Sequence, residues 1–170
     1  MPRPRYDAAV DPQFSQTVEE VARRPEVLEA VSRLYADVQR EIDSRKPVCV
    51  MSGRCCRFEE YGHRLFVTTV ELAAFVHDLR QRETNSPPHS WDGSGCPFQS
   101  NKMCGVHAIR PFGCRMFFCD ATSTEWQNGQ YEQFHARLRR LHEELNVPYF
   151  YVEWRLALGA LGLSGRPSSF

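Results

Sequence analysis

All seven cysteines of this 170-residue chain lie between positions 49 and 119, and the segments on either side have none. Cysteines that serve only as small core residues would be scattered along a chain, so this clustering needs a chemical cause. An odd number of thiols cannot form a fully paired disulfide framework. A chain of this length also buries roughly 70% of its unfolded surface on folding, so it needs no covalent staples. We therefore interpret the cysteines as members of a site.

Composition and charge exclude several other classes of protein. The chain has 21 Lys and Arg and 21 Asp and Glu, so its formal net charge is zero, and no nucleic acid or anionic membrane is expected as a partner. The N-terminus lacks the apolar run of a secretory signal, and no stretch is long and apolar enough to cross a membrane. We therefore expect a cytoplasmic location, where clustered cysteines more often bind metal or carry redox chemistry than form structural disulfides.

Apolar residues recur at helical spacing over much of the chain outside the cysteines. Thr68 and Glu71 stand at the spacing of a capping box, in which a hydroxyl and a carboxylate satisfy the first backbone N–H groups of a helix. A short extended piece is predicted just before them, over 65–67. The sequence predicts helices over about 14–22, 25–42, 69–79, 124–145 and 149–161.

The expected architecture is mainly α. It consists of a single compact helical domain over residues 14–163, with a cysteine-cluster core over 49–119. Two irregular cysteine-rich loop segments of that core form a metal site in this interpretation. Residues 1–13 and 164–170 are expected to be flexible, and residues 82–95, rich in Pro, Gly, Ser and Asn, are expected to form a surface loop.

The cysteine spacing is C-x5-C-C followed, after a gap, by C-x7-C-x9-C-x4-C. Neither half has the C-x2-C spacing of zinc fingers or of thioredoxin-type redox motifs. Thiolate is nevertheless the soft ligand that selects zinc, Cu(I) and iron–sulfur clusters. The candidate metal ligands are Cys49, Cys55, Cys56, Cys96, Cys104, Cys114 and Cys119.

The adjacent pair Cys55 and Cys56 restricts the arrangement of these ligands. In an extended chain neighbouring side chains point to opposite faces, so both sulfurs would bind one small ion only with difficulty. Either one of the pair ligates while the other packs, or the two serve different metals. Four thiolates around Zn²⁺ or a [4Fe–4S]²⁺ core leave two net negative charges, which cationic side chains could offset. The arginines nearest the cysteines in sequence are Arg54, Arg57, Arg110 and Arg115.

A resemblance to a known family appears in these motifs. Cys49, Ser52, Cys55 and Cys56 follow the C-x2-C-x2-C-C opening of a bacterial cysteine-cluster family, and the segments from Cys96-Pro97-Phe98 to Arg110-Pro111-Phe112-Gly113-Cys114-Arg115 and Phe117-Phe118-Cys119 are similar to its second half. The resemblance implies zinc or iron chelation, or an iron–sulfur cluster. Ser52 stands where the family has cysteine, so seven cysteines resemble a set of eight with one altered. His107 stands where the family usually has tyrosine, either as a replacement ligand or packed in the tyrosine pocket.

Three functions are compatible with this pattern. The first is a metal-binding protein that holds zinc or an iron–sulfur cluster through clustered thiolates, with the metal ion or cluster as its partner. The second is a thiol- or cluster-dependent redox enzyme, for which Cys114 beside Arg115 is the best candidate for a reactive thiol. The third is an interaction module stabilised by metal. The sequence contains no Ser-His-Asp pattern, phosphate loop or H-E-x-x-H helix, and indicates no protein partner.

Overall fold

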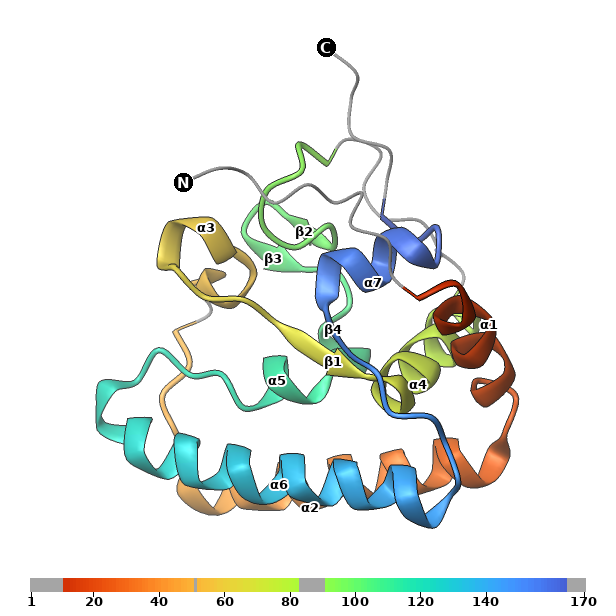
Figure 1. Ribbon diagram of the computed structural model, residues 1–170. Helices are drawn as coiled ribbons and strands as arrows, with labels where there is room; N and C mark the ends of the chain where they lie inside the picture. Colours follow the sequence, from red (N-terminus) through yellow and green to blue (C-terminus); the bar gives the residue numbers. More distant parts are fainter. Residues whose placement is uncertain (1–10, 51, 83–90, 165–170) are drawn as a thin grey trace.

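Two long helices, α2 (Pro25–Arg45) and α6 (Thr124–Glu144), lie side by side and run in opposite directions along one edge of the molecule (Figure 1). The computed structural model describes residues 11–50, 52–82 and 91–164. Apolar residues recur every three to four positions on α2, so one face is buried and the charged side chains remain outside. An ion pair between Asp37 and Arg137 joins the two helices near the surface.

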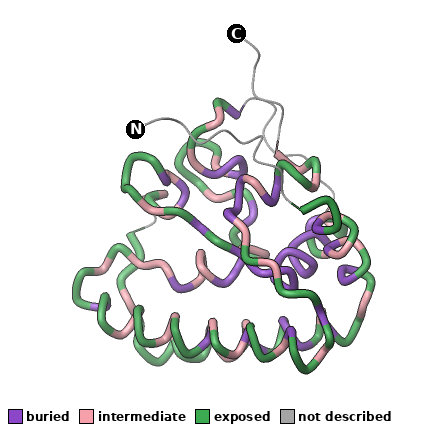
Figure 2. The backbone as a smooth tube through the Cα atoms, viewed as in Figure 1, coloured by how far each residue is buried: buried purple, intermediate pink, exposed green. Residues whose placement is uncertain are grey.

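Helix α4 (Thr69–Arg80) is the centre of the fold. Nine of its residues are buried, because α1 (Pro12–Val21) and α2 both pack against it. The predicted capping box is confirmed, with the Thr68 backbone N–H donating to Glu71 Oε2 at 2.8 Å. Figure 2 shows the buried residues concentrated around α4 and the neighbouring strands, while the outer faces of α2 and α6 are exposed.

A short antiparallel sheet pairs β1 (Phe66–Thr68) with β4 (Tyr151–Glu153), so that Val67 faces Val152 in the register. The prediction of a single helix over 149–161 is therefore wrong at its start. Residues 151–153 form a strand, and α7 begins only at Trp154 and ends at Ala160. The carboxylate of Glu153 caps this helix by accepting from the N–H groups of Arg155 and Leu156. Pairing with β1 provides backbone partners that an isolated first helical turn would lack.

The cysteine-rich segments consist of single turns and very short strands, as expected for irregular loops between helices. These elements are η1 (Arg54–Cys56), α3 (Phe58–Tyr61), β2 (Gln99–Ser100), β3 (Met103–Cys104), η2 (His107–Ile109), α5 (Phe112–Arg115) and η3 (Ala121–Ser123). Strands β2 and β3 pair with each other in a second antiparallel ribbon. The mainly α class is thus confirmed, with small sheets that the sequence did not indicate beyond 65–67.

The expected boundaries of the domain need two corrections. Helix α1 begins at Pro12, so this residue and Gln13 belong to the folded part and not to a flexible segment. Trp91, within the predicted surface loop, is buried, and its indole N–H donates to the Ser94 carbonyl at 2.7 Å. The other residues expected to be flexible, 1–10 and 165–170, and positions 83–90 of the loop lie outside the described residues.

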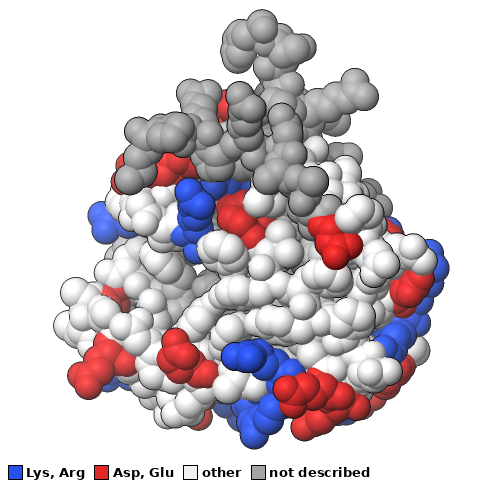
Figure 3. All heavy atoms as spheres, in the orientation of Figure 1, with Lys and Arg blue, Asp and Glu red and all other residues white. Residues whose placement is uncertain are grey.

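The surface carries both signs of charge. Figure 3 shows acidic and basic side chains interspersed on the visible face, most densely along α2 and α6. No helix within the described ranges is long and apolar enough to cross a membrane.

Candidate metal centre

A backbone hydrogen bond joins the two cysteine segments. The Cys96 N–H donates to the Cys56 carbonyl at 2.8 Å, although the two residues lie in different halves of the motif. Gly95 makes this approach possible, because its φ is +59° and a Cβ built on it would lie 2.6 Å from the Cys56 oxygen. Gly53, at φ +69°, plays the same part where Gln99 Nε2 donates to its carbonyl at 2.9 Å. These two glycines let the loops meet at backbone distance.

Four thiols converge at this junction, and we call Cys55, Cys56, Cys96 and Cys104 the thiol cluster. Cys56 is the shared member, because the thiols of Cys104, Cys55 and Cys96 all lie close enough to shift the pKa of its thiol. The Cys55 and Cys56 sulfurs are 4.0 Å apart. The argument that adjacent cysteines point to opposite faces was wrong in its premise, since residues 54–56 form a 3₁₀ turn and not an extended strand. The turn directs both sulfurs to the same side.

Hydrogen bonding to the Cys56 thiol lowers the pKa values of the neighbouring thiols. Hydrogen bonding with Cys104, Cys55 and Cys96, together with burial, raises the pKa of Cys56 far above its ordinary value. The same Cys56 hydrogen bond lowers the pKa of Cys55 to about 7 and that of Cys104 to about 6. It also lowers the pKa of Cys96. At neutral pH Cys104 therefore favours the thiolate form and Cys55 readily reaches it, and thiolate is the form that binds metal.

Cys114 lies beside the thiol cluster without a hydrogen bond to it. Burial is the main cause that raises the pKa of the Cys114 thiol, and the negative charges of Cys96, Cys55 and Cys104 raise it further. The residue that we singled out as a reactive thiol is thus held protonated in this arrangement, because burial and neighbouring thiolates outweigh the favourable charge of Arg110.

The four arginines near the cysteines take different positions. The charge of Arg110 is among the causes that lower the pKa values of Cys55 and Cys104, after the hydrogen bond from Cys56. Arg57 instead pairs with Glu60. Arg54 lies over the ring of Tyr61, and Arg115 donates to the carbonyls of Arg110 and Ala108. Of these four arginines, Arg110 is the one whose charge lowers pKa values in the thiol cluster, and Arg82 also lowers the pKa of Cys104.

Trp154 is a member of the site that the sequence did not reveal. Its indole N–H donates to Cys96 Sγ at 3.4 Å, and the ring is 1% exposed between Phe75 and Phe98. The tryptophan lies 58 positions from the cysteine at the start of another helix, so no spacing motif connects the two. N–H donors to sulfur orient thiolate ligands and stabilise their charge.

The remaining candidate ligands, Cys49 and Cys119, are exposed. In the described part of the chain neither sulfur interacts with the thiol cluster; Cys119 Sγ instead lies 3.6 Å from Ser52 Oγ. The backbone N–H of Val48 donates to Asp120 at 3.4 Å, so the first and last cysteine segments meet here. The position where the family has cysteine is therefore a neighbour of Cys119.

His107, expected either as a replacement ligand or packed in the tyrosine pocket, is exposed on the turn η2. Its Nδ1 lies 2.8 Å from Arg110 Nη1, and Arg110 also donates to the His107 carbonyl. Burial is the main cause that lowers the pKa of this imidazole, followed by the charges of Arg110 and Arg115. The imidazole is thus neutral and packed against a cation.

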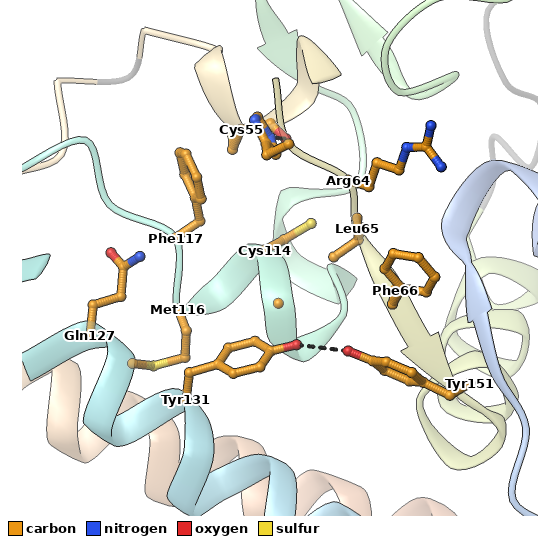
Figure 4. Close-up of a pocket in the computed structure, with 12 residues that line it drawn as sticks. Cys55, Arg64, Leu65, Phe66, Cys114, Met116, Phe117, Gln127, Tyr131 and Tyr151 are labelled. Atoms are coloured by element: carbon orange, nitrogen blue, oxygen red, sulfur yellow. Dashed lines mark hydrogen bonds between the residues drawn. The ribbon is translucent and has the colours of Figure 1, made fainter. Parts of the chain in front are cut away.

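A cavity of about 200 Å³ opens beside the thiol cluster. Figure 4 shows Cys55 and Cys114 at one end and the side chains of Tyr131 and Tyr151 at the other. The residues that line it are Cys55, His63, Arg64, Leu65, Phe66, Gly113, Cys114, Met116, Phe117, Gln127, Tyr131 and Tyr151. We call this space the aromatic cavity.

Comparisons with family models, curated proteins and solved structures find no match to this chain. The resemblance to the cysteine-cluster family therefore stays a prediction from the motif. Among residues 11–50, 52–82 and 91–164, no group of three or more His, Cys, Asp or Glu side chains is arranged so that it could hold a metal ion.

Proposed function

We propose that this chain is a metal-binding protein that holds zinc or an iron–sulfur cluster through the thiol cluster. The observation that supports the proposal is the convergence of four thiols from two distant segments on Cys56. Zn–S bonds of about 2.3 Å in a tetrahedron place two sulfurs about 3.8 Å apart. The 4.0 Å between Cys55 and Cys56 is close to that edge, so this pair fits a common ion with a small inward movement.

The chemistry of the surroundings supports the same proposal. The lowered pKa values of Cys55, Cys96 and Cys104 make these thiols easier to deprotonate for ligation, and Cys56 would lose its proton on binding. Four thiolates leave two net negative charges on zinc or on a [4Fe–4S]²⁺ core, which Arg110 and the Trp154 N–H offset. A closed four-thiolate site of this kind would join the two loops to the helices.

A redox role for the thiols is the second candidate, and the aromatic cavity favours it. Cys55, a member of the thiol cluster, lines the cavity, and so does Cys114, which lies beside the cluster. A small molecule in the cavity would therefore reach sulfur directly, which a purely structural site does not require. In this alternative the centre is an exchangeable or reactive thiol group.

The test is metal analysis of protein purified anaerobically from cells supplied with iron and zinc. We expect stoichiometric metal, with a broad visible absorption band if the metal is an iron–sulfur cluster. Cys56→Ser should lose the metal, whereas Cys49→Ser, at an exposed thiol outside the thiol cluster, should retain it. Protein that is metal-free and yet folded, as judged by circular dichroism, would overturn the proposal. Equal metal content in the two variants would also overturn it.

A further inference from the structure

The aromatic cavity has the size of a single ring. An apolar cavity of about 150 Å³ is sufficient to bind benzene in other proteins, so the 200 Å³ found here accommodates one substituted ring. It is smaller than the roughly 300–1,000 Å³ of pockets that take drug-sized molecules. Leu65 and Met116 contribute apolar surface to its lining.

The walls of the cavity are pairs of stacked rings. Phe66 stacks on Tyr151 with centroids 5.3 Å apart, and His63 stacks on Phe117 at 4.9 Å. His63 is held in place because its Nε2 lies 3.3 Å from the Cys55 carbonyl. Fixed aromatic faces favour a flat guest that can stack or meet them edge to face.

The polar groups of the cavity are chiefly hydrogen-bond donors. The hydroxyls of Tyr131 and Tyr151 are 3.2 Å apart, and whichever of them donates, the other keeps its own hydrogen for a guest (Figure 4). Burial, and then the Tyr151 hydroxyl, raise the pKa of Tyr131, so the Tyr131 hydroxyl keeps its proton. Gln127 Oε1 accepts from the Phe118 N–H at 2.9 Å, which leaves its NH₂ group as a second donor.

The charge of the lining indicates a neutral guest. No Asp or Glu is among the lining residues. Arg64 lines the cavity, but its guanidinium points away from the two tyrosines in Figure 4, so no fixed arginine charge faces the phenol pair. An anionic group would therefore enter this apolar space without a compensating charge, which is unfavourable.

We propose that the aromatic cavity binds a neutral, single-ring aromatic compound with a carbonyl oxygen, placed between the phenol pair and the sulfurs of Cys55 and Cys114. The carbonyl oxygen accepts from the free hydroxyl of the Tyr131–Tyr151 pair, and the ring lies between the aromatic walls. That the guest lies beside a metal centre rests on the proposed function. The binding itself needs only the cavity.

The test is calorimetric titration of the full chain with acetophenone, in metal-loaded and metal-free forms. Saturable binding of acetophenone is expected, with weaker binding of ethylbenzene, which lacks the acceptor, and of benzoate, which is charged. Replacing both donors, in the double variant Tyr131→Phe/Tyr151→Phe, should lower the affinity for acetophenone about two- to tenfold, the effect of one hydrogen bond. Tyr61→Phe, a matched change at an exposed tyrosine outside the cavity, should leave the affinity unchanged.

Three results would overturn this inference. They are no saturable binding of acetophenone, tighter binding of benzoate than of acetophenone, or an affinity unchanged when both hydroxyls are removed. The comparison of acetophenone with ethylbenzene uses the unmodified chain, so it tests the inference even if the double variant does not fold. Acetophenone binding by protein that never takes up metal would refute the metal proposal alone. Metal uptake without acetophenone binding would refute the cavity inference alone.

Discussion

Gly95 offers the sharpest test of how the two cysteine segments are held together. Its φ of +59° lies in the left-handed region, and a Cβ would meet the Cys56 carbonyl oxygen at 2.6 Å. The next residue, Cys96, donates its N–H to that same oxygen at 2.8 Å. Gly95→Ala therefore strains the backbone and pushes apart the two loop segments that carry Cys56 and Cys96.

The size of the effect follows from these two causes. A left-handed conformation costs an L-residue roughly 1–2 kcal/mol. Loss of the hydrogen bond between Cys96 and Cys56 adds about 0.5–1.5 kcal/mol. Gly95→Ala should therefore destabilise the fold by about 1.5–3.5 kcal/mol. Gly93→Ala is the matched control, because Gly93 has a φ of +85° with nothing within 4 Å of its would-be Cβ. The control should show the backbone cost alone.

The assay is urea unfolding of the wild type and both variants, together with metal content per chain. Gly95→Ala should unfold at a lower urea concentration than Gly93→Ala, with a free energy of unfolding lower by about 0.5–1.5 kcal/mol. It should also bind less metal. Gly93→Ala should keep the metal content of the wild type, since it leaves the junction intact. Equal unfolding midpoints and equal metal content for the two variants would refute the assignment of the junction to Gly95.

Three further outcomes are expected. Burial raises the pKa of Glu71 from 4.5 to about 7, so the free energy of unfolding should be highest below pH 4.5 and fall as the pH rises to about 7. This fall is at most about 3 kcal/mol. Glu71→Gln should reduce it, in unfolding measured across this pH range. Ser52→Cys should add a thiol beside Cys119 and raise the metal content per chain, whereas unchanged metal content would count against a second site there. Trp154→Phe removes the N–H donor to Cys96 and should weaken metal binding roughly tenfold in chelator competition. Equal metal affinity of the variant and the wild type would contradict this role of Trp154.

Local chemistry allowed much of the helical framework to be predicted. Pro25 at the first position of α2 and the Thr68–Glu71 capping box each act within a few residues, so their effects are readable along the chain. The start of α7 could not be predicted in this way, because Tyr151 pairs with Thr68 in a strand register that no local signal specifies. A partner far away in sequence replaced the helical turn that propensity alone suggested.

The sequence by itself determined that seven clustered thiols sit in irregular loops between helices, because composition, spacing and helical period are properties of the chain. Only the tertiary structure decided which sulfurs meet. It brought Cys55, Cys56, Cys96 and Cys104 together and left Cys49 and Cys119 at the surface. The physical reason is that a 3₁₀ turn and the close backbone approach at Gly95 fix the directions of the sulfurs, and both depend on contacts between segments that are distant in sequence.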